Sequence, residues 1–267
     1  MIPVFDFVEG STPVLVSVPH DGRNLAPGMK ERMSTIGRAL PDTDWHVRRL
    51  YQFAPNLGAS VISANYSRYV VDLNRPSTDE ELYKGQLFTG LCPSKTFAGE
   101  KIYLDGELVS QNEKQERVEQ YWQPYHDKIS FELARIKNKF GFALLWDAHS
   151  IPSQVPSLFS GTLTILNIGT VDGTSCDHRL TEAVYEIADE SEYSVVVDGR
   201  FKGGYITRAH GNPEENVHAL QLEKAQRAYM LEDTLIYDES AAEIFVKYLE
   251  KMLIAFVSEG TALLKKD

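Results

Sequence analysis

The apolar residues of this chain follow two patterns. Short apolar runs that are continuous, as a sheet covered on both faces requires, predict strands at 14–18, 59–64, 142–146, 163–167 and 195–197. Apolar residues at steps of three and four predict amphipathic helices at 112–140, from Asp44 to about Phe53, at about 214–232 and at about 240–258. Because strands alternate with helices, we expect a three-layer α/β/α fold around a mixed, largely parallel sheet.

Length and composition favour one domain over residues 1–267, since no Gly/Ser-rich or Pro-rich linker divides the chain. The net charge of −11 at pH 7 disfavours nucleic acid and anionic membrane surfaces as partners and favours a small molecule. The start lacks the layout of a secretory signal, so we expect a cytoplasmic protein. Cys92 and Cys176 stand alone and indicate neither a disulfide nor a cysteine zinc site.

Two of the predicted strands run into a histidine. The run VLVSV is followed by PHDG, which contains His20, and the run FALLW is followed by DAHS, which contains His149. Open α/β sheets hold ligands at the carboxyl ends of their strands, so these two histidines indicate a shared metal or catalytic site. Asp147 lies on the same side of an extended chain as His149 and can accept an imidazole N–H, although an Asx turn is an alternative role.

A zinc site with two histidines commonly takes a carboxylate as its third protein ligand. The stretch PDTDWHV offers Asp42 and Asp44 just before a predicted helix, where capping of that helix is the alternative role. Asp44 is the preferred ligand, because a carboxylate in the first turn of a helix is held more rigidly than one in the preceding loop. His46 lies off the apolar stripe and is expected to be a surface or packing residue.

The stretch YSRYVVDLNRP brackets a short apolar run with Arg68 and Arg75. Two guanidiniums so close in sequence favour anion recognition, because the planar fork of arginine matches a carboxylate, and Asn74 can add an amide donor to the same oxygens. The structural alternative is a salt bridge, for example between Asp72 and Arg75.

Six motifs in a single order resemble the N-formylglutamate amidohydrolase (N-formylglutamate deformylase) family over nearly the whole chain: SVPHDG, PDTDWHVRRLY, YSRYVVDLNRP, LLWDAHSIPS, GRFKGGYITRAHGNP and VHALQLEKAQRAYM. The family is related to the zinc carboxypeptidases and aspartoacylases, which implies a phosphorylase/hydrolase-like fold and one zinc ion. The implied reaction is hydrolysis of N-formyl-L-glutamate to formate and L-glutamate, the last step of a histidine degradation route.

The resemblance also implies roles for individual residues. The implied zinc ligands are His20, Asp44 and His149. His20 is not followed by the His-x-x-Glu spacing of the zinc carboxypeptidases, so the carboxylate comes from elsewhere, and Asp42 and Asp21 stay open as alternatives to Asp44. The other implied roles are a clamp for a substrate carboxylate, an oxyanion-stabilising cation and a general base, carried by Asn74 with Arg75, by Arg68 and by Glu223, respectively.

The glycines of GRFKGGYITRAHGNP are costly to order, and we expect this stretch to be a loop that closes over substrate. N-formylglutamate carries two carboxylates, so charge matching calls for a second cation besides Arg75. Arg208 is the candidate, with a surface role as its alternative and with Lys202, His210 and His218 as reserves. Two other functions fit the same residues: a zinc deacylase for another N-acyl amino acid, and a binding protein for an acidic amino acid that uses no metal.

Overall fold

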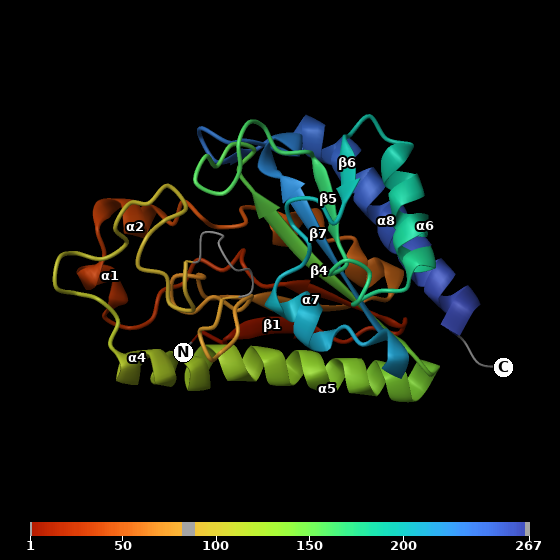
Figure 1. The fold of residues 1–267 in the computed structure, drawn as a ribbon, viewed down its shortest axis with the longest axis horizontal. Helices are drawn as coiled ribbons and strands as arrows, with labels where there is room; N and C mark the ends of the chain where they lie inside the picture. The colour runs from red at the N-terminus through yellow and green to blue at the C-terminus, as the bar shows by residue number, and fades with distance from the viewer. Residues whose placement is uncertain (1, 82–88, 265–267) are drawn as a thin grey trace.

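A seven-stranded sheet forms the centre of the computed structural model, which describes residues 2–81 and 89–264 (Figure 1). Its strands are β1 Phe5–Val8, β2 Val14–Val18, β3 Ser60–Ala64, β4 Ala143–Ile151, β5 Leu166–Gly169, β6 Val195–Val197 and β7 Val217–Ala225. They lie in the order β1-β3-β2-β4-β7-β5-β6. Only the β1–β3 and β5–β7 pairs of this sheet are antiparallel, so the sheet is mixed and largely parallel.

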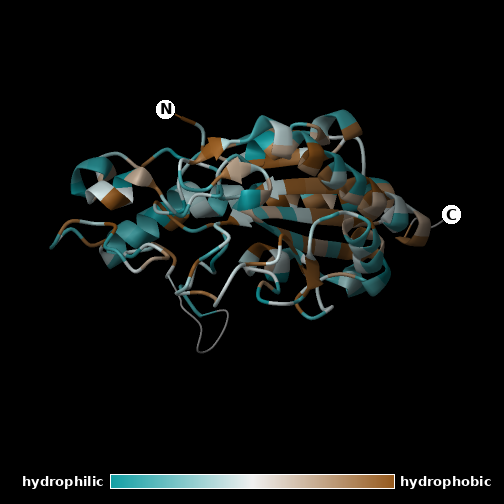
Figure 2. Ribbon diagram, turned by 90° about the horizontal axis from the view of Figure 1, so that it is seen from above, coloured by the Kyte–Doolittle hydropathy of each residue, from teal (hydrophilic) through white to brown (hydrophobic). Residues whose placement is uncertain are grey.

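Helices cover both faces of the sheet (Figure 1). The long α5 Gln123–Phe140 continues α4 Gln111–Arg117 along one face, and α6 His178–Asp189 packs with α8 Glu239–Leu264 on the other. This arrangement confirms the three-layer α/β/α prediction. In Figure 2 the strands in the middle of the molecule are mostly brown, the hydrophobic colour, as expected for a sheet covered on both sides. Within the described ranges, no helix has both the length and the apolar character that a membrane crossing requires.

The remaining elements are short. They are the helices α1 Met29–Arg32, α2 Thr35–Ala39, α3 Val47–Leu50 and α7 Tyr205–His210, the turns η1 Ala54–Leu57, η2 Val118–Trp122, η3 Pro213–Glu215 and η4 Gln226–Ala228, and a separate hairpin of β8 Met230–Leu231 with β9 Ile236–Tyr237. The η2 turn is π-helical and joins α4 to α5.

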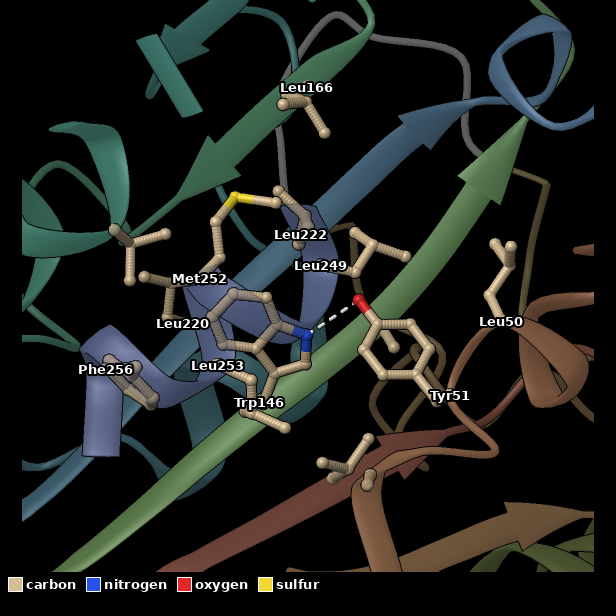
Figure 3. Close-up of a cluster of buried hydrophobic side chains, with 14 of the residues drawn as sticks. Leu50, Tyr51, Trp146, Leu166, Leu220, Leu222, Leu249, Met252, Leu253 and Phe256 are labelled. Atoms are coloured by element: carbon tan, nitrogen blue, oxygen red, sulfur yellow. Dashed lines mark hydrogen bonds between the residues drawn. The ribbon is translucent and has the colours of Figure 1, made fainter. Parts of the chain in front are cut away.

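Residues of β4 and β7 alternate between the two faces of the sheet. Trp146 lies in the core between the sheet and α8, together with Leu220 and Leu222 (Figure 3). Its indole Nε1 donates a hydrogen bond to the Tyr51 hydroxyl at 2.8 Å, which satisfies the polar atom of a fully buried ring. Neighbouring residues along each strand therefore point to the other face, which carries Asp147 and His149 of β4 and Gln221 and Glu223 of β7.

Several predicted elements are confirmed. The strands at 14–18 and 195–197 have the predicted bounds, the helix at 112–140 corresponds to α4, η2 and α5, and the last helix corresponds to α8. The strand predicted at 142–146 is longer, because β4 continues through His149 to Ile151. His149 therefore lies within β4, where it pairs with Glu223 of β7, and not in a loop after the strand. The strand β1 and the helix α6 were not predicted.

The helix predicted at about 214–232 is wrong, since the structure has strand β7 there. The sequence VHALQLEKA consists largely of good helix formers, and its apolar spacing is compatible with a helix. Because β7 is buried on both faces, its sequence lacks the alternation that identifies a half-exposed strand. The location in the centre of the sheet overrides the local preference.

The helix predicted from Asp44 is a single short element, α3, and Asp44 does not cap it. The residue at the N-cap is His46, whose side chain makes no capping bond. Instead, the Asp21 carboxylate at the end of β2 accepts the Arg48 backbone N–H at 2.8 Å. A carboxylate from a neighbouring strand end thus stabilises α3, which leaves Asp44 available for another contact.

The core on the α8 face makes a testable contribution to stability. Leu249 is fully buried on α8, whereas Ile244 on the same helix is 55% exposed. Leu249→Ala should lower the free energy of unfolding by about 2 to 5 kcal/mol, because it removes buried methyl groups and leaves a cavity. Ile244→Ala is the matched control and should change it by less than about 0.5 kcal/mol. Urea unfolding of both variants measures the difference, and equal losses would contradict the described packing.

Candidate metal and active site

The structure brings His20, Asp44 and His149 together beyond β2 and within the end of β4. All three are buried, and one ligand atom of each lies within 4.8 Å of the others. The Nδ1 of His149 is 3.1 Å from Oδ2 of Asp44, and the Nδ1 of His20 is 3.8 Å from Oδ1 of the same carboxylate. Two imidazole nitrogens and a carboxylate oxygen form a donor set that suits a zinc ion.

Each histidine also contacts a second carboxylate through its other nitrogen. Oδ1 of Asp72 lies 2.8 Å from His20 Nε2, and Oδ2 of Asp147 lies 3.0 Å from His149 Nε2. An ionised carboxylate only accepts, so Nε2 carries a proton in both rings, and Asp44 accepts from the Nδ1 of His149 in the same way. The Nδ1 atoms of both rings face Asp44. The amide nitrogen of Asn74 lies 3.1 Å from His149 Nε2 as well, but the charged carboxylate is the stronger partner.

These contacts confirm the predicted role of Asp147 and reveal Asp72, which the sequence did not indicate as a partner of His20. Asp72 is fully buried, and its Oδ1 also accepts the Asn74 backbone N–H at 2.9 Å. Its carboxylate therefore joins the stretch DLNR to the end of β2. A signal for it existed in the sequence, because a buried metal-binding histidine usually has a carboxylate partner, but the partner lies 52 residues away.

The site residues strongly perturb one another's protonation. Burial lowers the pKa of His149, but the carboxylates of Asp147 and Asp44 outweigh it and raise the pKa to about 10. Burial and the Arg68 guanidinium lower the pKa of His20. The Arg68 guanidinium contacts His20 Nδ1 and lies 3.2 Å from Asp44 Oδ1, so it places a positive charge beside the candidate ligands.

The alternative carboxylate ligands lie elsewhere. Asp42 accepts the Tyr69 hydroxyl at 2.7 Å and the Phe97 backbone N–H at 2.9 Å, and Asp21 caps α3. Asp44 is oriented by its own neighbours, because its backbone N–H donates to the His20 carbonyl at 3.1 Å and its Oδ2 accepts the Ser150 N–H at 3.0 Å. Geometry therefore favours Asp44 over Asp42 and Asp21. His46 bonds to the Leu235 carbonyl, away from the cluster.

Glu223 lies beside His149 in the β4–β7 register, with its side chain on the same face of the sheet. The residue is only 7% exposed, and burial raises the pKa of its carboxyl group to about 7. Oε2 of Glu223 is 3.5 Å from Nε2 of Gln221, whose Oε1 accepts the Gly204 N–H at 2.7 Å. Glu223 is thus a buried strand residue, suited to exchange a proton near neutral pH.

A cavity that opens to solvent is lined by several of these groups. His20, His149 and Glu223 line it, together with four cationic side chains, which are Arg68, Arg75, Arg200 and Lys202. The cavity is therefore positively charged at several points in a protein of net charge −11. Such a lining favours a small anionic ligand.

The structure brings some of the predicted substrate-binding residues to this cavity. Asn74 and Arg75 line it, and the Asn74 Oδ1 also accepts the Ile206 N–H of α7 at 2.8 Å. Arg208 is not among the described residues that line the cavity; it lies on α7, where its Nε donates to the Gly203 carbonyl at 3.2 Å. Arg208 was predicted from charge matching alone. Charge matching gives no information on how far a side chain lies from the cavity.

The three reserve candidates for the second cation lie in different places. His210 contacts His126 at 3.2 Å, and the Nδ1 of His218 accepts the Asp177 N–H at 3.1 Å, whereas Lys202 lines the cavity. The glycine-containing stretch includes the helix α7, so it is not a loop throughout. Arg200 and Gln221 line the cavity too and were not singled out from the sequence.

Together, the buried donor set and the neighbouring carboxylate at the end of the sheet suit a hydrolase that activates water. A model of the N-formylglutamate amidohydrolase family matches residues 12–230, and the chain belongs to this family. The resemblance of the sequence motifs is confirmed.

Relatives that are named N-formylglutamate deformylases match nearly the whole chain. The N-formylglutamate deformylases of Pseudomonas putida and Pseudomonas aeruginosa are 45% and 47% identical to it over 262 residues, which is 97% of this chain and 98% of each relative. The solved structure of an N-formylglutamate amidohydrolase from Ralstonia eutropha JMP134 superposes with a TM-score of 0.83 at 26% identity, over 97% of this chain and 100% of that chain.

The contact between Asp72 and His20 predicts an effect on metal binding. Asp72→Asn should weaken the affinity for Zn²⁺ by about 10- to 100-fold, because the carboxylate that orients His20 and raises its basicity is lost. Competition with a chromophoric chelator measures this affinity without any turnover. Asp105→Asn, in an ion pair with 85% of the aspartate side chain exposed, is the control and should bind Zn²⁺ as the unchanged protein does. Equal affinities of all three proteins would show that Asp72 does not support a metal ligand.

Proposed function

We propose that this protein is a zinc-dependent hydrolase that converts N-formyl-L-glutamate to formate and L-glutamate, the last step of a histidine degradation route, within a single domain over residues 1–267. The observation that carries the proposal is the buried cluster of His20, Asp44 and His149, whose two histidines line one cavity together with Glu223. The deformylase relatives, at 45% and 47% identity over nearly the whole chain, support the choice of substrate.

The cluster fits a zinc ion by the chemistry of its donors. Both Nδ1 atoms face the Asp44 carboxylate, and Asp72 and Asp147 hold the opposite nitrogens. His20, Asp44 and His149 would hold the zinc ion, which would supply Lewis acidity that lowers the pKa of a water molecule and polarises the formyl carbonyl. For His20 Nδ1 to serve as a ligand, the Arg68 guanidinium would have to give up its contact with that nitrogen, because one lone pair cannot serve both cations.

Glu223 carries the proton transfer in this proposal. Its ionised carboxylate accepts a proton from the attacking water, and the same group later delivers a proton to the nitrogen that leaves as the amine of glutamate. A pKa raised towards neutrality suits both steps, since the group must be deprotonated first and protonated afterwards.

The arginines hold the negative charges of the substrate. Arg68 borders the cluster and, once displaced from His20, stabilises the negative charge that develops on the formyl oxygen when water attacks the formyl carbon. Arg75 lines the same cavity beside Asn74, and the two residues bind a substrate carboxylate through a guanidinium and an amide N–H group. Asp72 supports this clamp as well, because its backbone oxygen accepts the Arg75 N–H at 3.2 Å.

Formate release tests the proposal. Purified protein should release formate from N-formyl-L-glutamate, lose this activity when stripped by a chelator and regain it when Zn²⁺ is restored. N-acetyl-L-glutamate is the control for the acyl group, and its hydrolysis at an equal rate would point to a broader deacylase. Absence of formate from folded, zinc-loaded protein would refute the proposed reaction.

The role of Glu223 has its own signature. Glu223→Gln should reduce kcat about 100- to 10,000-fold while Zn²⁺ binding persists, because the general base is lost but the metal ligands remain. Glu215→Gln, at an exposed glutamate just before β7, is the matched control and should leave kcat unchanged. An equal kcat for Glu223→Gln and the unchanged protein would exclude this role.

The pH profile follows from the same carboxyl group. Only its ionised form accepts a proton, and burial raises its pKa to about 7, so kcat/KM should fall as the pH falls below that value. A bound zinc ion would favour the ionised form of Glu223 and would move the fall of kcat/KM towards lower pH. Activity that increases steadily from pH 7 to pH 5 would contradict the assignment.

A further inference from the structure

We propose that Trp122 and His126 are positioning residues for the substrate clamp, because their ring N–H groups hold the backbone carbonyls on either side of Asn74. The inference rests on the proposed function, since it takes Asn74 and Arg75 to bind a substrate carboxylate. Neither aromatic residue touches the substrate in this account, and both act through the stretch DLNR.

Two hydrogen bonds attach this stretch to the helical segment that contains α5. The indole Nε1 of Trp122 donates to the Arg75 carbonyl oxygen at 2.9 Å, and Nε2 of His126 lies 2.9 Å from the Leu73 carbonyl oxygen. A carbonyl oxygen only accepts, so Nε2 carries the proton of His126. Asn74 therefore lies between two residues whose carbonyl groups are held from the same side.

The two donors have a fixed spacing because their rings pack together. Trp122 ends η2 and His126 follows four residues later in α5, so the two side chains lie on one face of the segment. The rings stack, with centroids 3.8 Å apart and an angle of 26° between the planes. The η2 turn is π-helical, and single π-helical turns within helices are frequent at functional sites.

The helix α7 holds His126 from the opposite side. Nδ1 of His126 lies 3.2 Å from Nε2 of His210, and the two imidazole planes differ by 11°. Burial lowers the pKa of His126 to about 3 and that of His210 to about 4, so both rings are neutral near pH 7. A neutral His126 with its proton on Nε2 accepts the His210 Nε2–H through Nδ1, and both of its nitrogens are thus satisfied.

The same helix orients the side chain of Asn74. Its amide oxygen accepts the Ile206 N–H at 2.8 Å, and this directs the amide nitrogen towards the site, where it lies 3.1 Å from His149 Nε2. A Cβ atom at position 204 would collide with the Asn74 side chain, so Gly204 permits this close approach of α7. Backbone and side chain of Asn74 are both oriented before substrate binds, which favours affinity.

Two substitutions at position 126 separate the hydrogen bond from the ring. The side-chain nitrogen of glutamine can take the place of Nε2, whereas that of asparagine reaches only the place of Nδ1. His126→Asn should raise KM for N-formyl-L-glutamate about 3- to 10-fold, the range expected for one hydrogen bond, and His126→Gln should keep it within about 2-fold. We expect no change of kcat in either variant, because the clamp binds substrate and transition state alike.

Trp122→Phe tests the other donor. It keeps an aromatic ring beside His126 but has no N–H for the Arg75 carbonyl, so KM should again rise about 3- to 10-fold while kcat and the affinity for Zn²⁺ are unchanged. His178→Asn is the matched control, since 83% of that histidine side chain is exposed, and it should leave KM unchanged.

Two results would overturn the assignment. Equal losses of kcat in His126→Gln and His126→Asn, without a rise in KM, would mean that His126 supports the structure only. A KM that is unchanged in both His126→Asn and Trp122→Phe would show that the two donors do not position the clamp.

Binding of the product separates this inference from the proposed reaction. Calorimetry of the zinc-loaded protein with L-glutamate needs no turnover, and Trp122→Phe and His126→Asn should each weaken binding about 3- to 10-fold. If the unchanged protein releases no formate but binds L-glutamate, and both variants bind it more weakly, the reaction is refuted and the inference stands. Formate release with an unchanged KM in both variants refutes the inference alone. If the unchanged protein neither releases formate nor binds L-glutamate, both are refuted.

Discussion

The site depends on one kind of contact, a carboxylate that holds the Nε2 of a buried histidine. Asp72 and Asp147 make this contact with His20 and His149, and both carboxylates are fully buried. Charges so far from water are tolerated only when they are paired, so the rings and carboxylates are held in mutual orientation. As a result, both Nδ1 atoms face Asp44, and three donors from separate parts of the chain form a site suited to a cation.

The sheet supplies the frame for these contacts. β4 and β7 pair in parallel, and their register places Asp147 opposite Gln221 and His149 opposite Glu223. A slip of one residue in either strand would move Asp147 and His149 of β4, or Gln221 and Glu223 of β7, into the apolar core on the α8 face, where Trp146 packs (Figure 3). The hydrophobic core on one face therefore fixes the position of the candidate site residues on the other.

Local signals in the sequence were sufficient for some of this arrangement. His20 and His149 were predicted because each follows an apolar run within a few residues, and the alternation of elements indicated the three layers. β7 was assigned to a helix, because a strand buried on both faces has no periodicity that distinguishes it from a helix rich in Leu, Ala and Glu. Asp72 was missed because its contact with His20 joins distant segments, and charge matching selected Arg208, which does not line the cavity among the described residues, because charge carries no information on position.

The central claim is that the two Nδ1 atoms and the Asp44 carboxylate bind one metal ion. The most direct measurement is an anomalous difference map from crystals of the zinc-loaded protein, collected at the zinc absorption edge. The account predicts a peak bonded to Nδ1 of His20, Nδ1 of His149 and the carboxylate of Asp44, with Asp72 and Asp147 still on the Nε2 atoms. A zinc peak bonded to Nε2 of either ring, or one that Asp44 does not contact, would contradict it.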